Sequence, residues 1–141
     1  HFHERVGTNE ACRHPVIYNG DILTIEDIRC ITEKFPKLTG VMIGRGLLAN
    51  PALGWEYKEG RKLTPEEWRE KLRALHTAVF QHYETQIQGG EAQLVTKMKT
   101  FWEYFMPSTD RKILKKIHKS NKLTQYNEAV VKAFMPGDEE E

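Results

Sequence analysis

The chain has 141 residues, of which 21 are basic and 20 acidic, so its formal net charge at pH 7 is +1. This balance excludes a strongly basic or strongly acidic protein, and any charged partner must be recognised by local patterns. Two cysteines are too few for a disulfide framework, and no segment approaches the roughly 18 consecutive apolar residues of a membrane span, so we expect a soluble cytoplasmic protein.

Two short apolar runs, each followed by a glycine-containing turn, organise the N-terminal part of the sequence. Residues 16–18 and 41–43 are continuously apolar, which is typical of strands buried on both faces of a parallel sheet. Between them, Thr24 and Asp27 form a capping-box-like start, and isoleucines at helical spacing lead to a stop at Pro36. The pattern predicts parallel strands joined through a helix by a right-handed crossover.

The two turns are the candidate ligand site. Asn19, Gly20 and Asp21 follow the first predicted strand, and Gly44 and Arg45 follow the second. Parallel sheets collect ligands at the carboxyl ends of their strands, where glycine lets an anion approach the backbone and arginine adds a charged contact. The turns therefore predict a phosphate site. The alternative is structural, since glycine-containing turns also end many buried strands for steric reasons.

The remaining sequence has helical periodicity. Thr64 has the position of an N-cap, with proline and glutamate following it as in a capping box, and a stripe of apolar residues at intervals of three and four continues from there. Residues 55–62 are interpreted as a polar connector at a domain boundary. We predict four helices with short connections, a small bundle, at residues 64–88, at 91–105, from 108 or 109 onward, and at 124–135.

One predicted helix has a basic face. From Arg111 to Lys122 the chain has six basic residues and no acidic one. At the angular spacing of an α-helix, four lysines fall within roughly 100° of arc, with apolar residues on the other side. Such a row suits a phosphate backbone, and the alternative is a solvated face that keeps the helix soluble. The candidate nucleic-acid-binding residues are Lys112, Lys115, Lys116 and Lys119, extended by Lys97 and Lys99 on the preceding helix.

Several stretches of the sequence resemble the tRNA-dihydrouridine synthases: NGDI, TIEDI, GVMIGRGLLANPAL, GGEAQLVTKMKTFWEYF and KLTQYNEAV. The resemblance runs from residue 15 to about residue 134. It implies the last two β/α units of a TIM barrel over residues 1–60, a helical tRNA-binding domain over 61–137, and an acidic disordered tail over 138–141. The expected fold class is thus an α/β fragment followed by an all-α domain, because a complete barrel needs roughly 250 residues.

The same resemblance implies a chemistry. The residues of the two turns match the family's contacts with the phosphate end of flavin mononucleotide (FMN), and the basic helix would contact tRNA. In the family, reduced flavin passes a hydride to uracil, a cysteine supplies a proton, and NADPH re-reduces the flavin. Neither Cys12 nor Cys30 fits that acid, so both are interpreted as small apolar residues. We assign no catalytic or metal-binding residue and expect the 141 residues alone to be inactive.

Two other functions remain open. The chain could be an RNA-binding helical module without catalysis of its own, or part of another FMN-dependent TIM-barrel oxidoreductase that acts on a small metabolite. The basic helix favours a polyanion over a small metabolite. Because two isolated strands have unpaired edges, we also expect self-association through those edges.

Overall fold

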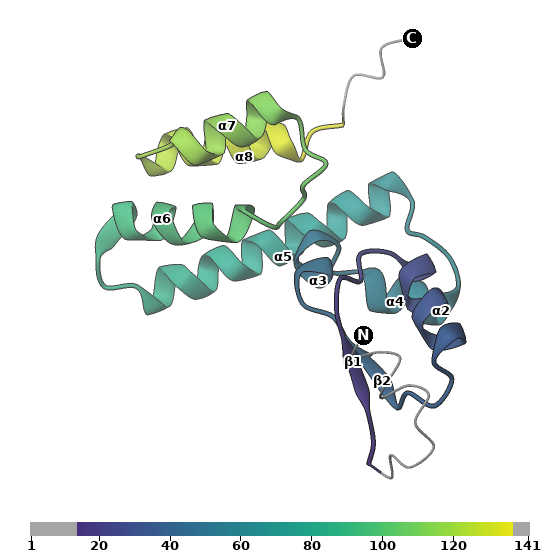
Figure 1. Ribbon diagram of the computed structural model, residues 1–141. Coiled ribbons are helices and arrows are strands. Elements are labelled where there is room, and N and C mark those ends of the chain that lie inside the picture. Colours follow the sequence, from purple (N-terminus) through teal and green to yellow (C-terminus); the bar gives the residue numbers. More distant parts are fainter. Residues whose placement is uncertain (1–13, 137–141) are drawn as a thin grey trace. The chain divides into compact units, whose positions relative to one another are not determined.

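The computed structural model describes residues 14–136, and the chain divides between Lys62 and Leu63 into two compact units (Figure 1). We call residues 14–62 the N-terminal unit and residues 63–136 the helical unit. Each has its own hydrophobic core. The predicted acidic tail and Cys12 lie outside the described residues.

The N-terminal unit contains the predicted strand–helix–strand arrangement. Strand β1 (Ile17–Asn19) pairs in parallel with β2 (Gly40–Met42), and helix α2 (Ile25–Lys34) connects them. The capping box is confirmed: the Thr24 hydroxyl accepts a hydrogen bond from the Asp27 N–H, and the Asp27 carboxylate accepts one from the Thr24 N–H. The helix therefore begins where the sequence predicts, with two of its free N–H groups satisfied locally.

Only one face of the strand pair is buried. Tyr18, Val41 and Ile43 pack against a core made of Ile22, Ile25, Ile28 and Leu53. On the opposite face, Ile17 and Met42 are 56% and 55% exposed. The prediction that both faces are buried is therefore wrong for the described chain, because the side chains that pack against the strands come from one side of the sheet.

Two short helices follow β2, namely α3 (Arg45–Ala49) and α4 (Leu53–Glu59). The interpretation of residues 55–62 as a polar connector is wrong up to residue 59. Leu53 and Glu56 lie on the inward side of α4 and are only 1% and 4% exposed, while most of its other side chains face solvent. Gly60 then ends the helix in the left-handed conformation, with φ of 69°.

The helical unit contains α5 (Pro65–Gln86), α6 (Gly90–Trp102), α7 (Arg111–Lys119) and α8 (Leu123–Ala133). The predicted capping box of α5 is confirmed, with Thr64 and Glu67 bonded reciprocally. Helix α6 ends before the predicted Phe105, and α7 begins later than predicted because the Asp110 carboxylate caps it by accepting from the Lys112 N–H. Helices α7 and α8 lie side by side (Figure 1).

All four helices contribute to one core, as the periodicity predicts. Its buried members are Leu72, Leu94, Val95, Met98, Trp102, Phe105, Met106, Ile117, Tyr126, Ala129, Val130 and Phe134. Five more apolar residues at the predicted intervals of three and four pack against this core and are partly buried: Trp68, Leu75, Val79 and Tyr83 of α5, and Ile87 at its C-cap.

A hydrogen-bonded trio lies inside this core. The Trp102 indole N–H donates to the Tyr126 hydroxyl oxygen at 2.9 Å, and that oxygen is 2.7 Å from His76 Nε2. Burial lowers the pKa of His76 to about 4 and raises the pKa of Tyr126, so both are neutral at pH 7. An indole N–H can only donate, so the Tyr126 oxygen accepts from Trp102. If the Tyr126 hydroxyl in turn donates to His76 Nε2, the indole N–H, the hydroxyl and Nε2 each have a hydrogen-bond partner. His76 thus packs inside the core of the helical unit and accepts a buried hydrogen bond there.

Candidate functional site

The two predicted turns lie at one edge of the sheet. Asn19 ends β1, and Gly44 separates β2 from α3; because the strands are parallel, both turns are at the carboxyl-terminal edge. Asn19, Gly20 and Gly44 are exposed there. The structure brings Asp21 and Arg45 into direct contact across this edge.

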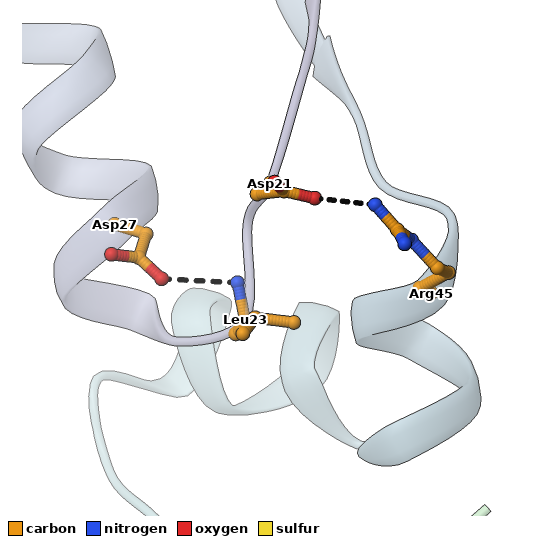
Figure 2. Close-up of polar contacts among 4 residues, drawn as sticks. All are labelled: Asp21, Leu23, Asp27 and Arg45. Atoms are coloured by element: carbon orange, nitrogen blue, oxygen red, sulfur yellow. Dashed lines mark hydrogen bonds and ion pairs between the residues drawn. The ribbon is translucent and has the colours of Figure 1, made fainter. Parts of the chain in front are cut away.

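The Asp21–Arg45 pair orients the arginine. Arg45 Nη2 donates to Asp21 Oδ1 at 2.8 Å, while the two side chains remain 81% (Asp21) and 67% (Arg45) exposed (Figure 2). An ion pair this exposed contributes roughly 0–1 kcal/mol to stability, so its main effect is on geometry. A guanidinium has five N–H donors, and the contact with Asp21 uses its Nη2 end. The group therefore keeps donors that a phosphate could engage.

The loop that carries Asp21 is fixed at its far end by α2. The Asp27 carboxylate accepts hydrogen bonds from the N–H groups of Leu23 and Thr24, each at 3.0 Å, and Figure 2 shows the bond to Leu23. These contacts lower the pKa of the Asp27 carboxyl, and the hydrogen bond from Leu23 has the largest effect. The acidic residue that starts α2 thus also anchors the turn after β1.

Gly46 allows α3 to pack closely against this loop. Gly46 is buried, and a Cβ added to it would overlap the carbonyl oxygen of Ile22, which is backbone and cannot move aside as a side chain could. Around Gly44 an added Cβ would meet open space instead. The glycine that sterics require in the GRG sequence is therefore the second one, which holds Arg45 near the turn after β1.

The basic face is present on α7 as predicted. Ile117 is buried and Ile113 and Leu114 are partly buried, whereas all four lysines of the predicted row are exposed. The helix thus fixes a row of cations on its solvent side. The four residues are Lys112, Lys115, Lys116 and Lys119.

The two lysines of α6 differ from each other. Lys97 is exposed, whereas Lys99 is partly buried and its ammonium group donates to the Ser120 carbonyl oxygen at 2.7 Å. Ser120 is the C-cap of α7, so Lys99 satisfies a carbonyl at the helix end where a positive charge is favourable. Lys99 therefore has a structural contact in addition to the predicted role.

A cavity of about 330 Å³ lies between α7 and α8, and sequence reasoning missed it. Its α8 lining includes Gln125, Glu128 and Lys132, and its α7 side includes Lys116 and Lys119. The spacing 125, 128, 132 marks one face of a helix. The helical spacing of these residues is visible in the sequence. Only the packing of α8 against α7 shows that this face meets the lysine row of α7.

Other candidate chemistry is sparse in the described chain. Cys30, which was interpreted as a small apolar residue, is exposed on α2, whereas Ile25 and Ile28 supply the inward side of that helix. Across residues 14–136 no three His, Cys, Asp or Glu side chains gather as metal ligands. Within the same range, no helix combines the length and hydrophobicity that a membrane crossing requires.

Comparison with known proteins gives a family match over nearly the whole chain. The sequence model of the family described as dihydrouridine synthase matches residues 8–136. These residues include both predicted turns and all four helices of the helical unit.

Curated relatives share the chain's sequence over shorter segments. A Mus musculus protein named tRNA-dihydrouridine(47) synthase-like is 34% identical over 87 residues, which cover 62% of this chain and 13% of that protein. A tRNA-dihydrouridine(16) synthase of Pseudomonas syringae pv. tomato is 37% identical over 71 residues, or 48% of this chain and 22% of that protein. The matched segments are thus a small part of these relatives.

Proposed function

Because the chain belongs to the dihydrouridine synthase family, we propose that the protein containing it is an oxidoreductase that reduces uridine to 5,6-dihydrouridine in tRNA. The match over residues 8–136 carries this proposal, because it includes both structural units rather than a single motif. The matched segments make up 13% and 22% of two relatives, so we assign the activity to the full-length protein and expect the 141 residues alone to be inactive.

In this proposal the N-terminal unit is the end of a TIM barrel, and the helical unit is a small bundle appended to it. The parallel pair β1 and β2, joined through α2, supports the barrel assignment. The exposed apolar face at Ile17 and Met42 also supports it, because barrel strands are covered on both faces.

We place the phosphate end of FMN at the two turns. Arg45 supplies the charged contact, and the exposed backbone of Gly20 and Gly44 lets the anion approach closely. Asp21 would repel a phosphate if it faced one directly, so its part is to hold the guanidinium in place across 2.8 Å. Bound FMN would supply the hydride chemistry, and NADPH is the proposed reductant of the flavin. The residues of this chain bind and orient the phosphate end of FMN.

The basic face of α7 is the proposed tRNA contact of the helical unit. Its four lysines are exposed and lie on one side of a helix whose other side packs into the core. Lysines arranged in this way neutralise backbone phosphates without regard to sequence, and they make the affinity depend on salt.

The flavin part of the proposal is tested in the full-length protein with Arg45→Ala. The matched control is Arg29→Ala, because Arg29 is an exposed arginine of α2. We expect Arg45→Ala to lower the FMN content of the purified protein and its dihydrouridine formation in tRNA with NADPH, and Arg29→Ala to change neither. Equal FMN content in the two variants would contradict the assignment. A wild-type protein that binds FMN but reduces no uridine in tRNA would contradict the proposed reaction.

A second candidate, an RNA-binding module without catalysis, is favoured by one observation: the helical unit has a core of its own. The 141-residue chain should then bind unmodified tRNA in a salt-dependent way while binding FMN weakly. Binding of FMN without tRNA would instead favour a barrel enzyme that acts on a small metabolite.

A further inference from the structure

The cavity between α7 and α8 has the charge of an anion site. Three lysines and one glutamate are among the residues that line it: Lys116 and Lys119 come from α7, and Lys132 and Glu128 come from α8. Lys132 is 13 residues from Lys119 in the sequence and joins the basic face only through helix packing. Charge therefore continues across the groove onto the second helix.

The wall of the cavity on the α7 side is held by hydrogen bonds. Ser120 is only 3% exposed, and its hydroxyl donates to the Lys116 carbonyl oxygen at 2.7 Å. The Ser120 carbonyl oxygen accepts from the Lys99 ammonium group at 2.7 Å. The carbonyls of a helix C-terminus repel anions, and these contacts provide donors to two of them. Gln125 Oε1 accepts from the Asn121 N–H at 3.3 Å, which leaves the amide NH₂ as a further donor at the cavity.

The open shape favours one group of a polymer over a free small molecule. The cavity is open to solvent, and every residue that lines it except Ala129 carries a polar or charged group, while aliphatic side-chain stems make up much of its wall. Sites for small organic ligands are instead clefts or cavities that bury most of the ligand's surface. An open groove with lysines on both sides accommodates a phosphate whose chain enters at one side and leaves at the other. Lysine binds phosphate as a mobile point charge and needs no fixed fork geometry.

We propose that this cavity seats one phosphodiester group of a bound RNA strand, so that the strand crosses from α7 to α8 at Lys132 instead of following α7 alone. The inference rests on the proposed tRNA binding and specifies its path. The Glu128 carboxylate repels a bound phosphate because both are negatively charged, and it therefore limits the affinity of the site. Removing the lysine and removing the glutamate should consequently have opposite effects.

The test is a titration of the 141-residue chain with unmodified tRNA at several salt concentrations, using Lys132→Gln, Glu128→Gln and the control Lys71→Gln. Lys71 is an exposed lysine of α5, so it reports the effect of net charge alone. We expect Lys132→Gln to weaken binding roughly three- to tenfold and to reduce the slope of log K against log salt by about 0.7–0.9, the value for one phosphate contact. Glu128→Gln should tighten binding, and circular dichroism checks the fold of each variant.

Two outcomes separate this inference from the function on which it rests. Suppose that the chain binds tRNA and that Lys112→Gln weakens this binding, but that Lys132→Gln has the same tRNA affinity as Lys71→Gln. The basic face of α7 is then supported as the tRNA contact, and the path that crosses to α8 is overturned. If the wild-type chain binds no tRNA at low salt, both are overturned. A polyglutamate peptide that binds more tightly than tRNA, with the same dependence on Lys132, would identify the site as one for an acidic protein segment and would also overturn the proposal.

Discussion

Replacing Tyr126 by phenylalanine tests the hydrogen-bonded trio of the helical unit with the loss of a single oxygen atom. The Tyr126 ring is fully buried, and its hydroxyl is the partner of both Trp102 Nε1–H and His76 Nε2. Phenylalanine keeps the ring contacts, including the stacking on His76 at a centroid distance of 6.0 Å. The substitution therefore changes polar satisfaction and leaves packing nearly constant.

The expected cost follows from two orphaned groups. Trp102 is 2% exposed and His76 is 7% exposed, so water cannot easily replace the lost partner. Leaving a buried donor or acceptor unsatisfied costs about 1–3 kcal/mol. Two such groups, less the desolvation of the hydroxyl that the variant no longer has to bury, give a loss of about 2–4 kcal/mol in the free energy of unfolding of the helical unit.

Urea unfolding followed by tryptophan fluorescence measures this loss. In a Trp55→Phe background the remaining tryptophans, Trp68 and Trp102, both belong to the helical unit, so the signal reports that unit. Tyr104→Phe is the matched control, because Tyr104 is 44% exposed and should change stability by less than about 0.5 kcal/mol. If Tyr126→Phe costs no more than this control, the trio does not stabilise the core and the reasoning is refuted.

Four further predictions concern separate features. Gly46→Ala should destabilise the N-terminal unit by about 1–3 kcal/mol because its Cβ would overlap the Ile22 carbonyl; Gly54→Ala, with open space at its Cβ, should be neutral or stabilising, and equal effects would contradict the close approach. Burial lowers the pKa of His76 from 6.5 to about 4, so the unfolded chain binds the proton more readily than the folded chain. The free energy of unfolding of the helical unit should therefore fall by about 3 kcal/mol as pH drops from about 6.5 to about 4. Urea unfolding at several pH values measures it, and a free energy of unfolding that stays constant across that range would refute this. Thr64→Ala should cost about 1 kcal/mol through loss of the α5 capping box, measured by thermal unfolding, whereas no change would show the cap to be dispensable. If the strand edges self-associate as predicted, sedimentation of the 141-residue chain should show a concentration-dependent dimer, and a monomer at all concentrations would contradict it.

Local chemistry determined where helices α2 and α5 begin. The capping boxes at Thr24 and Thr64 form as predicted, because a side chain that bonds the amide three residues on requires only short-range contacts. The inward stripe of α5 follows for a similar reason, since helical periodicity fixes which side chains share a face. Helix α4 was missed because only two of its seven residues are buried, too few for a periodic signal.

Contacts between distant residues required the tertiary structure. Sequence placed Asp21 and Arg45 at strand ends, but the ion pair across 24 positions depends on the parallel pairing and on the close packing at Gly46. In the helical unit, sequence identified the lysine row of α7, whereas Lys132 of α8 joins it only because α8 packs against α7. The sequence by itself thus determined which residues share a helix face and where the two helices with capping boxes, α2 and α5, begin, because those properties are set within a few residues. Which faces meet depends on how apolar surface is buried over the whole unit, and only the tertiary structure decided that.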